Sequence, residues 1–203
     1  MEKKLPIRRI ERMKNSFPDF LTQPVDDVAK QLLGCIFVRE IDGEIVRVRI
    51  VETESYDQDD EASHTFGGLR KRNATMFKEA GHMYVYFTYG MHYCCNVVSG
   101  VPGYGSGVLI RAVEPLDGVD VLEKRRGVRG INCTNGPAKL CQALGIDLRM
   151  NGHDLRQGSM KLITGALQPN EEIATSSRVG ISRAKDALRR YYIKDNPYVS
   201  RHK

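Results

Sequence analysis

The residues best suited to chemistry lie in the first part of the chain, around a run of aromatic side chains. Glu54 and Tyr56 are followed by His64, then by the aromatic run 84–96, and then by Arg111. Aromatic faces can hold a flat base between rings, and a carboxylate beside them can activate a water molecule. These residue types therefore predict a site for chemistry on a flat aromatic ring.

Alternation places Glu54 near the end of a strand. From Val46 to Tyr56, the even positions change from apolar residues to Glu52, Glu54 and Tyr56. Successive strand side chains point to opposite faces, so one face begins as an apolar wall and ends in two carboxylates and a phenol. Such a face is typical of a pocket rim. It is equally typical of a strand that leaves the core with its last residues solvated, and both interpretations stay open here.

Tyr89 occupies the tip of a second hairpin, predicted from the alternation between residues 83 and 98. Gly, Asn or Asp would turn the chain more easily than tyrosine, so this residue calls for an explanation. One is that the ring folds back and packs locally. The other is that it acts as a wedge that enters a stack of bases.

Turn residues and periodicity predict the other elements. We expect helices within 17–34, at 57–68, after a turn at 135–144, and near 182–190. We expect paired strands at 35–39 and 44–56 across the turn Asp42-Gly43, and a further strand at 108–113. Basic loops are expected at 69–73 and 124–129. Helical and alternating segments are thus both expected in this chain.

Length and composition predict one domain of 203 residues, at 17–203, preceded by a basic arm at 1–16. No apolar run could span a bilayer, and the amino terminus lacks a signal-peptide core, so we expect no membrane partner and no secretion. The five cysteines are odd in number and follow no zinc spacing. We therefore expect a reduced protein without a metal or other cofactor.

The net charge of +6 favours a polyanionic partner. The basic residues gather at the amino-terminal arm, at 124–129 and at 183–203. Each group alone is more typical of a solvated face. Together with the aromatic centre, they make nucleic acid the preferred partner class.

Taken in order, the motifs resemble those of the alkyladenine DNA glycosylases, the mammalian type of 3-methyladenine glycosylase that also occurs in bacteria. The similarity runs from about Phe20 to Val199. The motifs are Leu32-Leu33-Gly34, Val51-Glu52-Thr53-Glu54-Ser55-Tyr56, Ala62-Ser63-His64, Tyr84-Val85-Tyr86, Tyr89-Gly90-Met91, Asn96, Arg111-Ala112, Gly136-Pro137, Lys139-Leu140-Cys141-Gln142-Ala143-Leu144 and Arg178-Val179-Gly180.

The resemblance implies a single α/β domain on a curved, largely antiparallel sheet. It also implies a monomeric, monofunctional glycosylase that acts on double-stranded DNA without a cofactor, in the cytoplasm at the nucleoid if the source is bacterial. The expected substrates are 3-methyladenine, 7-methylguanine, hypoxanthine and ethenoadenine, each flipped out of the duplex and released by hydrolysis to leave an abasic site.

The resemblance assigns roles to individual residues. Glu54 corresponds to the general base, and Arg111 with the backbone carbonyl of Val179 to groups that hold the attacking water. Tyr56 corresponds to the residue that stacks on one face of the flipped base, and His64 and Tyr86 to those on the other face. Asn96 lies where a guanine 2-amino group would press. Tyr89 corresponds to the residue inserted into the duplex.

Two other functions remain open from the residues alone. A nucleic-acid-binding module without catalysis would not require an acid at position 54. A glycoside hydrolase could use Glu52 and Glu54 as paired carboxylates, although the chain contains no tryptophan for a sugar platform.

Overall fold

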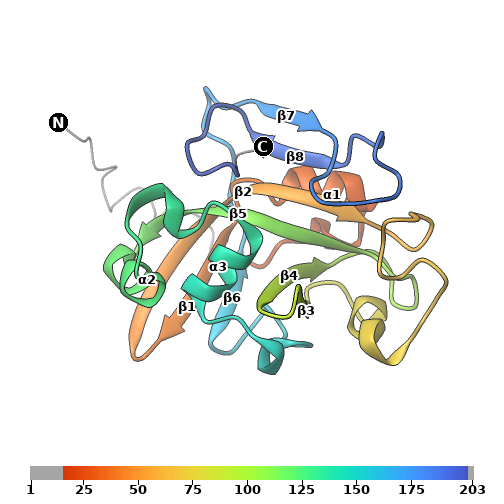
Figure 1. The fold of residues 1–203 in the computed structure, drawn as a ribbon, viewed down its shortest axis with the longest axis horizontal. Coiled ribbons are helices and arrows are strands. Elements are labelled where there is room, and N and C mark those ends of the chain that lie inside the picture. The colour runs from red at the N-terminus through yellow and green to blue at the C-terminus, as the bar shows by residue number, and fades with distance from the viewer. Residues whose placement is uncertain (1–15, 201–203) are drawn as a thin grey trace.

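One antiparallel sheet forms the framework of the protein in a computed structural model that describes residues 16–200 (Figure 1). Its strands are β1 (Ile36–Ile41), β2 (Glu44–Tyr56), β3 (Met83–Thr88), β4 (His92–Val98), β5 (Gly107–Asp117), β6 (Met160–Ile163), β7 (Ile173–Ser176) and β8 (Arg190–Ile193). The order is β3-β4-β5-β2-β1-β6, with β8 pairing with both β2 and β7, and each of these ladders is antiparallel. The strands run in clearly different directions across Figure 1, as in a strongly twisted, curved sheet.

Three α-helices cover this sheet within residues 16–200: α1 (Val25–Gln31), α2 (Val119–Arg126) and α3 (Pro137–Leu144). Short 3-10 segments also occur within these residues: η2 (Phe20–Thr22), η3 (Lys71–Phe77), η4 (Gly130–Cys133) and η5 (Leu148–Met150). The helix α1 packs on β2, β5 and β8, whereas α3 packs on β4 and β5 and carries α2. The predicted mixed α/β fold on an antiparallel sheet with surrounding helices is therefore confirmed.

The central strand β2 has two partners along one edge. Its first half pairs with β1, its second half pairs with β8, and β5 follows it along the other edge. The second half of β2 is also buried, and Glu52 and Glu54 are each 0% exposed. The interpretation of a strand end with solvated carboxylates is wrong, because β8 and the chain before it cover that end.

The pairing of β2 with β5 is irregular after Arg47 and again around Glu52. Its register shifts on both sides of the pair Glu52↔Ala112, so that Val51 and Arg111 have no partner in the ladder. Extra residues of this kind bend a strand locally and re-aim side chains. Arg111 is thereby placed where it reaches two carboxylates of β2.

Both predicted hairpins are confirmed. Asp42 and Gly43 at the first tip have φ values of 51° and 83°, and Tyr89 and Gly90 at the second have 52° and 68°. Two consecutive positive φ values match the tight turn that suits the twist of paired strands. Asp tolerates this conformation readily, whereas a bulky tyrosine at positive φ is rare.

The segment 57–77 corrects two predictions. Residues 57–68 form successive turns instead of a helix, and η3 covers most of the stretch predicted as a basic loop. The Asp57 and Asp60 side chains each accept a hydrogen bond from the backbone N–H two residues ahead, at 3.0 and 2.9 Å. Such local bonds compete with helical ones, which is why the acidic start did not continue as a helix.

Two basic segments also differ from expectation. The helix predicted near 182–190 consists of bends and turns, and Ala184 adopts a φ of 47° that no helix allows. In contrast, Lys124–Arg126 form the last turn of α2, where basic side chains suit the helix dipole. Apart from Ser16, the predicted basic arm at 1–16 lies outside the described residues.

Candidate active site

A pocket of about 420 Å³ opens beside the carboxyl end of β2. The turns after β2, the β3–β4 hairpin, β5, the start of α3 and the segment before β8 all contribute to its wall. Seven of the predicted site residues line it: Tyr56, His64, Tyr86, Tyr89, Asn96, Arg111 and Val179. The fold therefore brings together residues that are more than a hundred positions apart in the chain.

Glu54 lies directly behind this lining and is held by three donors. The Val179 N–H donates to Oε1 at 2.8 Å, the Tyr56 hydroxyl donates to Oε2 at 2.8 Å, and Arg111 Nη1 lies 3.2 Å from Oε1. Burial raises the pKa of Glu54 above its ordinary value, while the three donors act in the opposite direction. The carboxylate is thus oriented toward the pocket lining and shielded from bulk solvent.

Arg111 joins this carboxylate to a second one. Its Nε donates to Glu52 Oε1 at 2.9 Å, and Arg190 Nε donates to the same oxygen at 2.6 Å. The Ser200 N–H and hydroxyl complete the coordination of Glu52 at 2.6 and 2.7 Å. Glu52 does not line the pocket, so its role is to hold Arg111.

The aromatic wall of the pocket is larger than predicted. His64 meets Tyr86 edge to face, with ring centroids 4.5 Å apart, and Tyr84 stacks on Tyr86 at 5.7 Å. The Tyr84 hydroxyl also lies 3.1 Å from His64 Nδ1. Tyr84 has no predicted role, although its spacing of two residues from Tyr86 on one strand indicates that both rings lie on the same face.

The His64 imidazole is biased toward its neutral form. Burial lowers its pKa, and the positive charge of Arg72 lowers it further. A neutral ring does not repel a positively charged ligand, and its edge and face remain available for contacts. His64 therefore adds no positive charge of its own to the pocket wall.

Asn96 and Cys94 are buried residues of β4 that line the pocket. Asn96 is buried, and its Nδ2 donates to the Tyr84 carbonyl at 3.3 Å, which fixes the amide against the wall. Burial raises the pKa of the Cys94 thiol to about 11, so it stays uncharged at neutral pH. Cys95, the next residue, belongs instead to the hydrophobic core, because successive strand side chains point to opposite faces.

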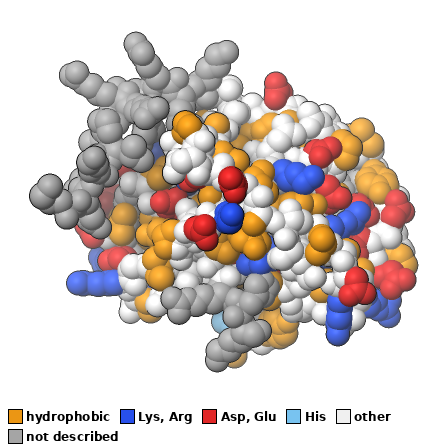
Figure 2. Space-filling view, turned by 90° about the horizontal axis from the view of Figure 1, so that it is seen from above, with side chains coloured by type: hydrophobic (Ala, Val, Ile, Leu, Met, Phe, Trp, Pro, Cys, Tyr) orange, Lys and Arg blue, Asp and Glu red, His pale blue; other side chains and the backbone are white. Residues whose placement is uncertain are grey.

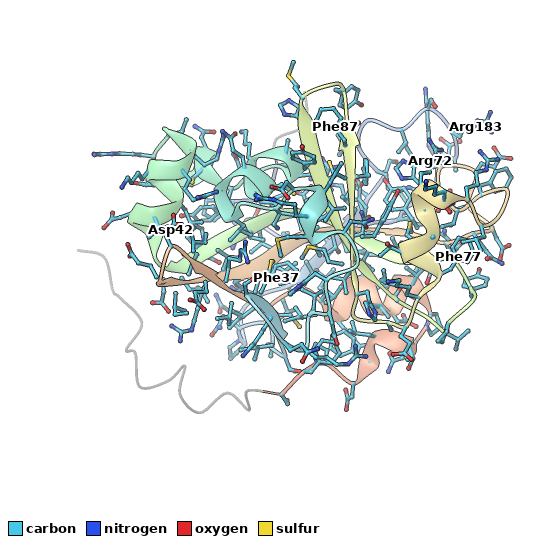
Figure 3. The ribbon with its side chains drawn as sticks, turned by 90° about the horizontal axis from the view of Figure 1, so that it is seen from below. Phe37, Asp42, Arg72, Phe77, Phe87 and Arg183 are labelled. Carbon is cyan, nitrogen blue, oxygen red and sulfur yellow. The ribbon has the colours of Figure 1, made fainter. Side chains whose placement is uncertain are left out.

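The predicted wedge stands at the mouth of the pocket. Tyr89 lines the opening, yet it is 80% exposed, so the ring does not fold back onto the protein. The exposed Phe87 is on the same projecting hairpin (Figure 3). Arg72 and Arg183 lie at this end of the molecule as well, and Arg183 lines the pocket. An aromatic tip beside cations is suited to a stacked, negatively charged polymer.

The side of the molecule that is seen from above has a mixed surface. On the face that Figure 2 shows, acidic and basic side chains are interspersed with apolar ones, without a continuous basic area.

Within residues 16–200, no helix is long and apolar enough to cross a membrane, and no group of three or more His, Cys, Asp or Glu side chains could hold a metal.

Comparison with known proteins agrees with this geometry. The sequence profile described as "Methylpurine-DNA glycosylase (MPG)" matches residues 19–197. The chain belongs to the methylpurine-DNA glycosylase family. Three relatives are provisionally named 3-methyladenine DNA glycosylases: from Carboxydothermus hydrogenoformans (49% identity, 90% of this chain and 96% of the relative), Methanoculleus marisnigri (47%, 86% and 92%) and Francisella tularensis (44%, 92% and 99%).

Membership in the methylpurine-DNA glycosylase family confirms the resemblance inferred from the motifs. The protein is an enzyme of base excision repair that hydrolyses the N-glycosidic bond of alkylated purines in DNA. The two alternative functions are therefore wrong. A glycoside hydrolase would also need Glu52 at the pocket opening. Glu52 instead lies behind the pocket, where Arg111, Arg190 and Ser200 donate hydrogen bonds to its carboxylate.

Proposed function

We propose that this methylpurine-DNA glycosylase excises 3-methyladenine, and with it 7-methylguanine, hypoxanthine and ethenoadenine, after flipping the nucleotide into the pocket beside Glu54. The observation that carries the proposal is a buried, triply coordinated carboxylate directly behind an aromatic pocket with an exposed tyrosine at its mouth. The enzyme acts as a monomer on double-stranded DNA and leaves an abasic site, in the cytoplasm at the nucleoid if it is bacterial.

In this mechanism, Glu54 accepts a proton from the water that attacks the sugar carbon. Arg111 and the backbone carbonyl of Val179 hold that water, while Tyr56 and the pair His64 and Tyr86 contact opposite faces of the base. The close positioning of water and sugar and the proton transfer to Glu54 contribute separately to the rate.

The chemistry of the lesion explains why no strong acid is needed for the leaving group. A purine alkylated at N3 or N7 is cationic, so its glycosidic bond is already weakened. Electron-rich rings attract such a base through cation–π contacts, worth about 0.5–2 kcal/mol each. Flipping costs least at damaged or mispaired bases, which adds selectivity before the chemical step.

The same pocket favours simple hydrolysis over strand cleavage. A glycosylase that also cuts the strand needs an amine nucleophile, and no lysine is among the described residues that line the pocket. The product is therefore an intact strand with an abasic site.

The test uses duplexes with one lesion each: 3-methyladenine, 7-methylguanine, hypoxanthine or ethenoadenine. Under single-turnover conditions, the free base should appear without strand breaks until alkali is added. Release of 3-methyladenine alone would narrow the proposed substrate range, and no release from any duplex would overturn it.

Tyr89→Asn should weaken the preference for lesion-containing duplex by about tenfold or more, while general DNA affinity changes little. Asparagine tolerates positive φ, so the hairpin turn survives and only the ring is lost. General binding depends on phosphate contacts and falls with added salt. The fluorescence of 2-aminopurine beside the lesion measures flipping, with Ile45→Asn as an exposed control at the other hairpin. Equal flipping by both variants would contradict the wedge.

Asn96→Ser should give a modest gain of guanine release, most visible opposite thymine. The serine side chain is shorter and leaves room for the 2-amino group, which is what distinguishes guanine from hypoxanthine. The gain is limited because pairing also protects a normal guanine. Single-turnover release of guanine from a G·T duplex and of hypoxanthine from its own duplex gives the comparison. An unchanged guanine rate would remove Asn96 from the selectivity argument.

A further inference from the structure

Arg178 is a buried residue of the Arg178-Val179-Gly180 motif that the mechanism above does not use. Its side chain is 0% exposed, and it comes from the segment between β7 and β8, which crosses the carboxyl end of β2 (Figure 1). It does not line the pocket, although Tyr56 in front of it and Val179 beside it both do. A buried guanidinium directly behind an active-site wall requires a structural reason, since burial of a charge is costly unless it is compensated.

The first contact of Arg178 is with the Tyr56 ring. Its Cζ lies 4.6 Å from the ring centroid, over the face of the aromatic system. Because Tyr56 lines the pocket and Arg178 does not, the guanidinium covers the ring face that is turned away from the pocket. The ring is therefore supported from behind in the orientation that a stacked base would meet.

Three further contacts hold the guanidinium in place. Its Nη1 donates to the Ser55 carbonyl at 2.9 Å, its Nη2 donates to Asp60 Oδ1 at 3.0 Å, and Nη1 also pairs with Asp60 Oδ2. Asp60 in turn accepts the Ala62 N–H at 2.9 Å, at the start of the turn that carries His64. The charge of Arg178 is thus neutralised by a carboxylate that also shapes the opposite wall.

The backbone of the same segment reaches the general base. Val179, the next residue after Arg178, donates its N–H to Glu54 at 2.8 Å. Fixing Arg178 between Tyr56 and Asp60 therefore also fixes the distance between Val179 and Glu54. One side chain connects the base-stacking ring, the turn of His64 and the support of the catalytic carboxylate.

We propose that Arg178 is a positioning residue of the reaction, a clamp that sets both the angle of the Tyr56 ring and the placement of the Val179 backbone on Glu54. This inference rests on the proposed function. Loss of the clamp should lower the excision rate through Val179 and the lesion affinity through Tyr56. A displacement of about 1 Å at such a site costs on the order of 100-fold in rate.

The chain offers a closely matched control. Arg49 is also nearly buried and forms a forked ion pair, with Glu171, on a part of β2 that does not line the pocket. The Nε atoms of Arg49 and Arg178 are the two buried side-chain polar atoms without a partner among the described residues. Arg49→Gln therefore removes an equivalent buried charge from a different place.

The experiment compares wild type, Arg178→Gln, Arg178→Lys and Arg49→Gln on a 3-methyladenine or hypoxanthine duplex. It measures thermal unfolding, lesion affinity and single-turnover rate. Both glutamine variants should lose stability, but only Arg178→Gln should lose excision rate, by about 100-fold. Arg178→Lys keeps the charge near Asp60 without the planar stack, so it should regain stability more fully than rate. This lysine variant serves as the test if Arg178→Gln does not fold.

A second comparison isolates the contact with the ring. In a Tyr56→Ala background, Arg178→Gln should cause little further loss of lesion affinity, because the ring that it supports is gone. An equal loss of affinity in both backgrounds, or a normal rate in folded Arg178→Gln and Arg178→Lys, would overturn the clamp. If wild type releases no base from any lesion, the proposed function fails and the clamp fails with it. Release by wild type together with equal rates for Arg178→Gln and Arg49→Gln overturns the clamp alone.

Discussion

Glu54→Gln is expected to lower the single-turnover rate of base release by about 10²–10⁴-fold while lesion binding persists, because the substitution removes the proposed proton acceptor. Glutamine can keep the hydrogen bonds of the carboxylate, although not its negative charge opposite Arg111. Its oxygen can accept from the Val179 N–H and Arg111 in place of Oε1, and its NH2 can donate to the Tyr56 hydroxyl, which reverses its role. Near-normal excision by this variant would contradict the general-base assignment.

The stability of this variant follows from the sign of the pKa shift. Burial raises the pKa of Glu54 in the folded protein, so protonation favours folding and the favourable contribution is lost as pH rises through that pKa. At neutral pH, the ionised side chain is therefore a cost that glutamine does not have. Glu54→Gln should unfold at a temperature no lower than wild type, which separates lost catalysis from lost structure.

The same shift has a consequence for the wild-type enzyme. A general base works only while it is ionised, so excision should fall as pH decreases through the pKa of Glu54. Because burial raises that pKa, the acid limb of the rate profile should lie above the range of an ordinary glutamate. A rate that stays constant down to the ordinary range would contradict this assignment.

Glu52→Gln, two residues earlier on the same strand, should have the opposite character and destabilise the fold by about 3–5 kcal/mol. Glu52 is the buried anion between Arg111 and Arg190, and removal of its charge leaves both cations with less compensation. Glutamine cannot satisfy the site. With its oxygen at Oε1, its NH2 group faces the Ser200 N–H, and a backbone donor cannot reverse its role.

Chemical denaturation measures this effect, with Glu172→Gln as the matched control. Glu172 has a side chain that is 74% exposed and lies 3.4 Å from Lys194, so its substitution should change the free energy of unfolding by less than about 0.5 kcal/mol. Excision by folded Glu52→Gln should also slow, since Arg111 loses its main anchor. Equal stability of the two variants would show that Glu52 does not anchor the site.

The sequence by itself determined the elements whose signal is local. Alternation located β2 and the two hairpins, and the Asp42-Gly43 pair identified the first turn because both residues accept positive φ. The same alternation placed Glu54 and Tyr56 on one face, which their hydrogen bond confirms. The ordered motifs identified the family, because side-chain types at fixed spacing carry the chemistry of the site.

The tertiary structure decided whatever depends on partners distant in the chain. The acidic segment after Asp57 does not form the predicted helix. Its carboxylates instead accept hydrogen bonds from nearby backbone N–H groups and pair with Arg178, which is more than a hundred residues away. The alternation is the same for a solvated and for a buried end of β2. The end is buried because β8, which is distant in the chain, pairs with it. Glu52 anchors Arg111, whereas Glu54 faces the pocket lining. This difference arises from the register shifts at Arg111 and from the contacts of Ser200 with Glu52. Burial and long-range pairing made that division, and neither leaves a mark on local spacing.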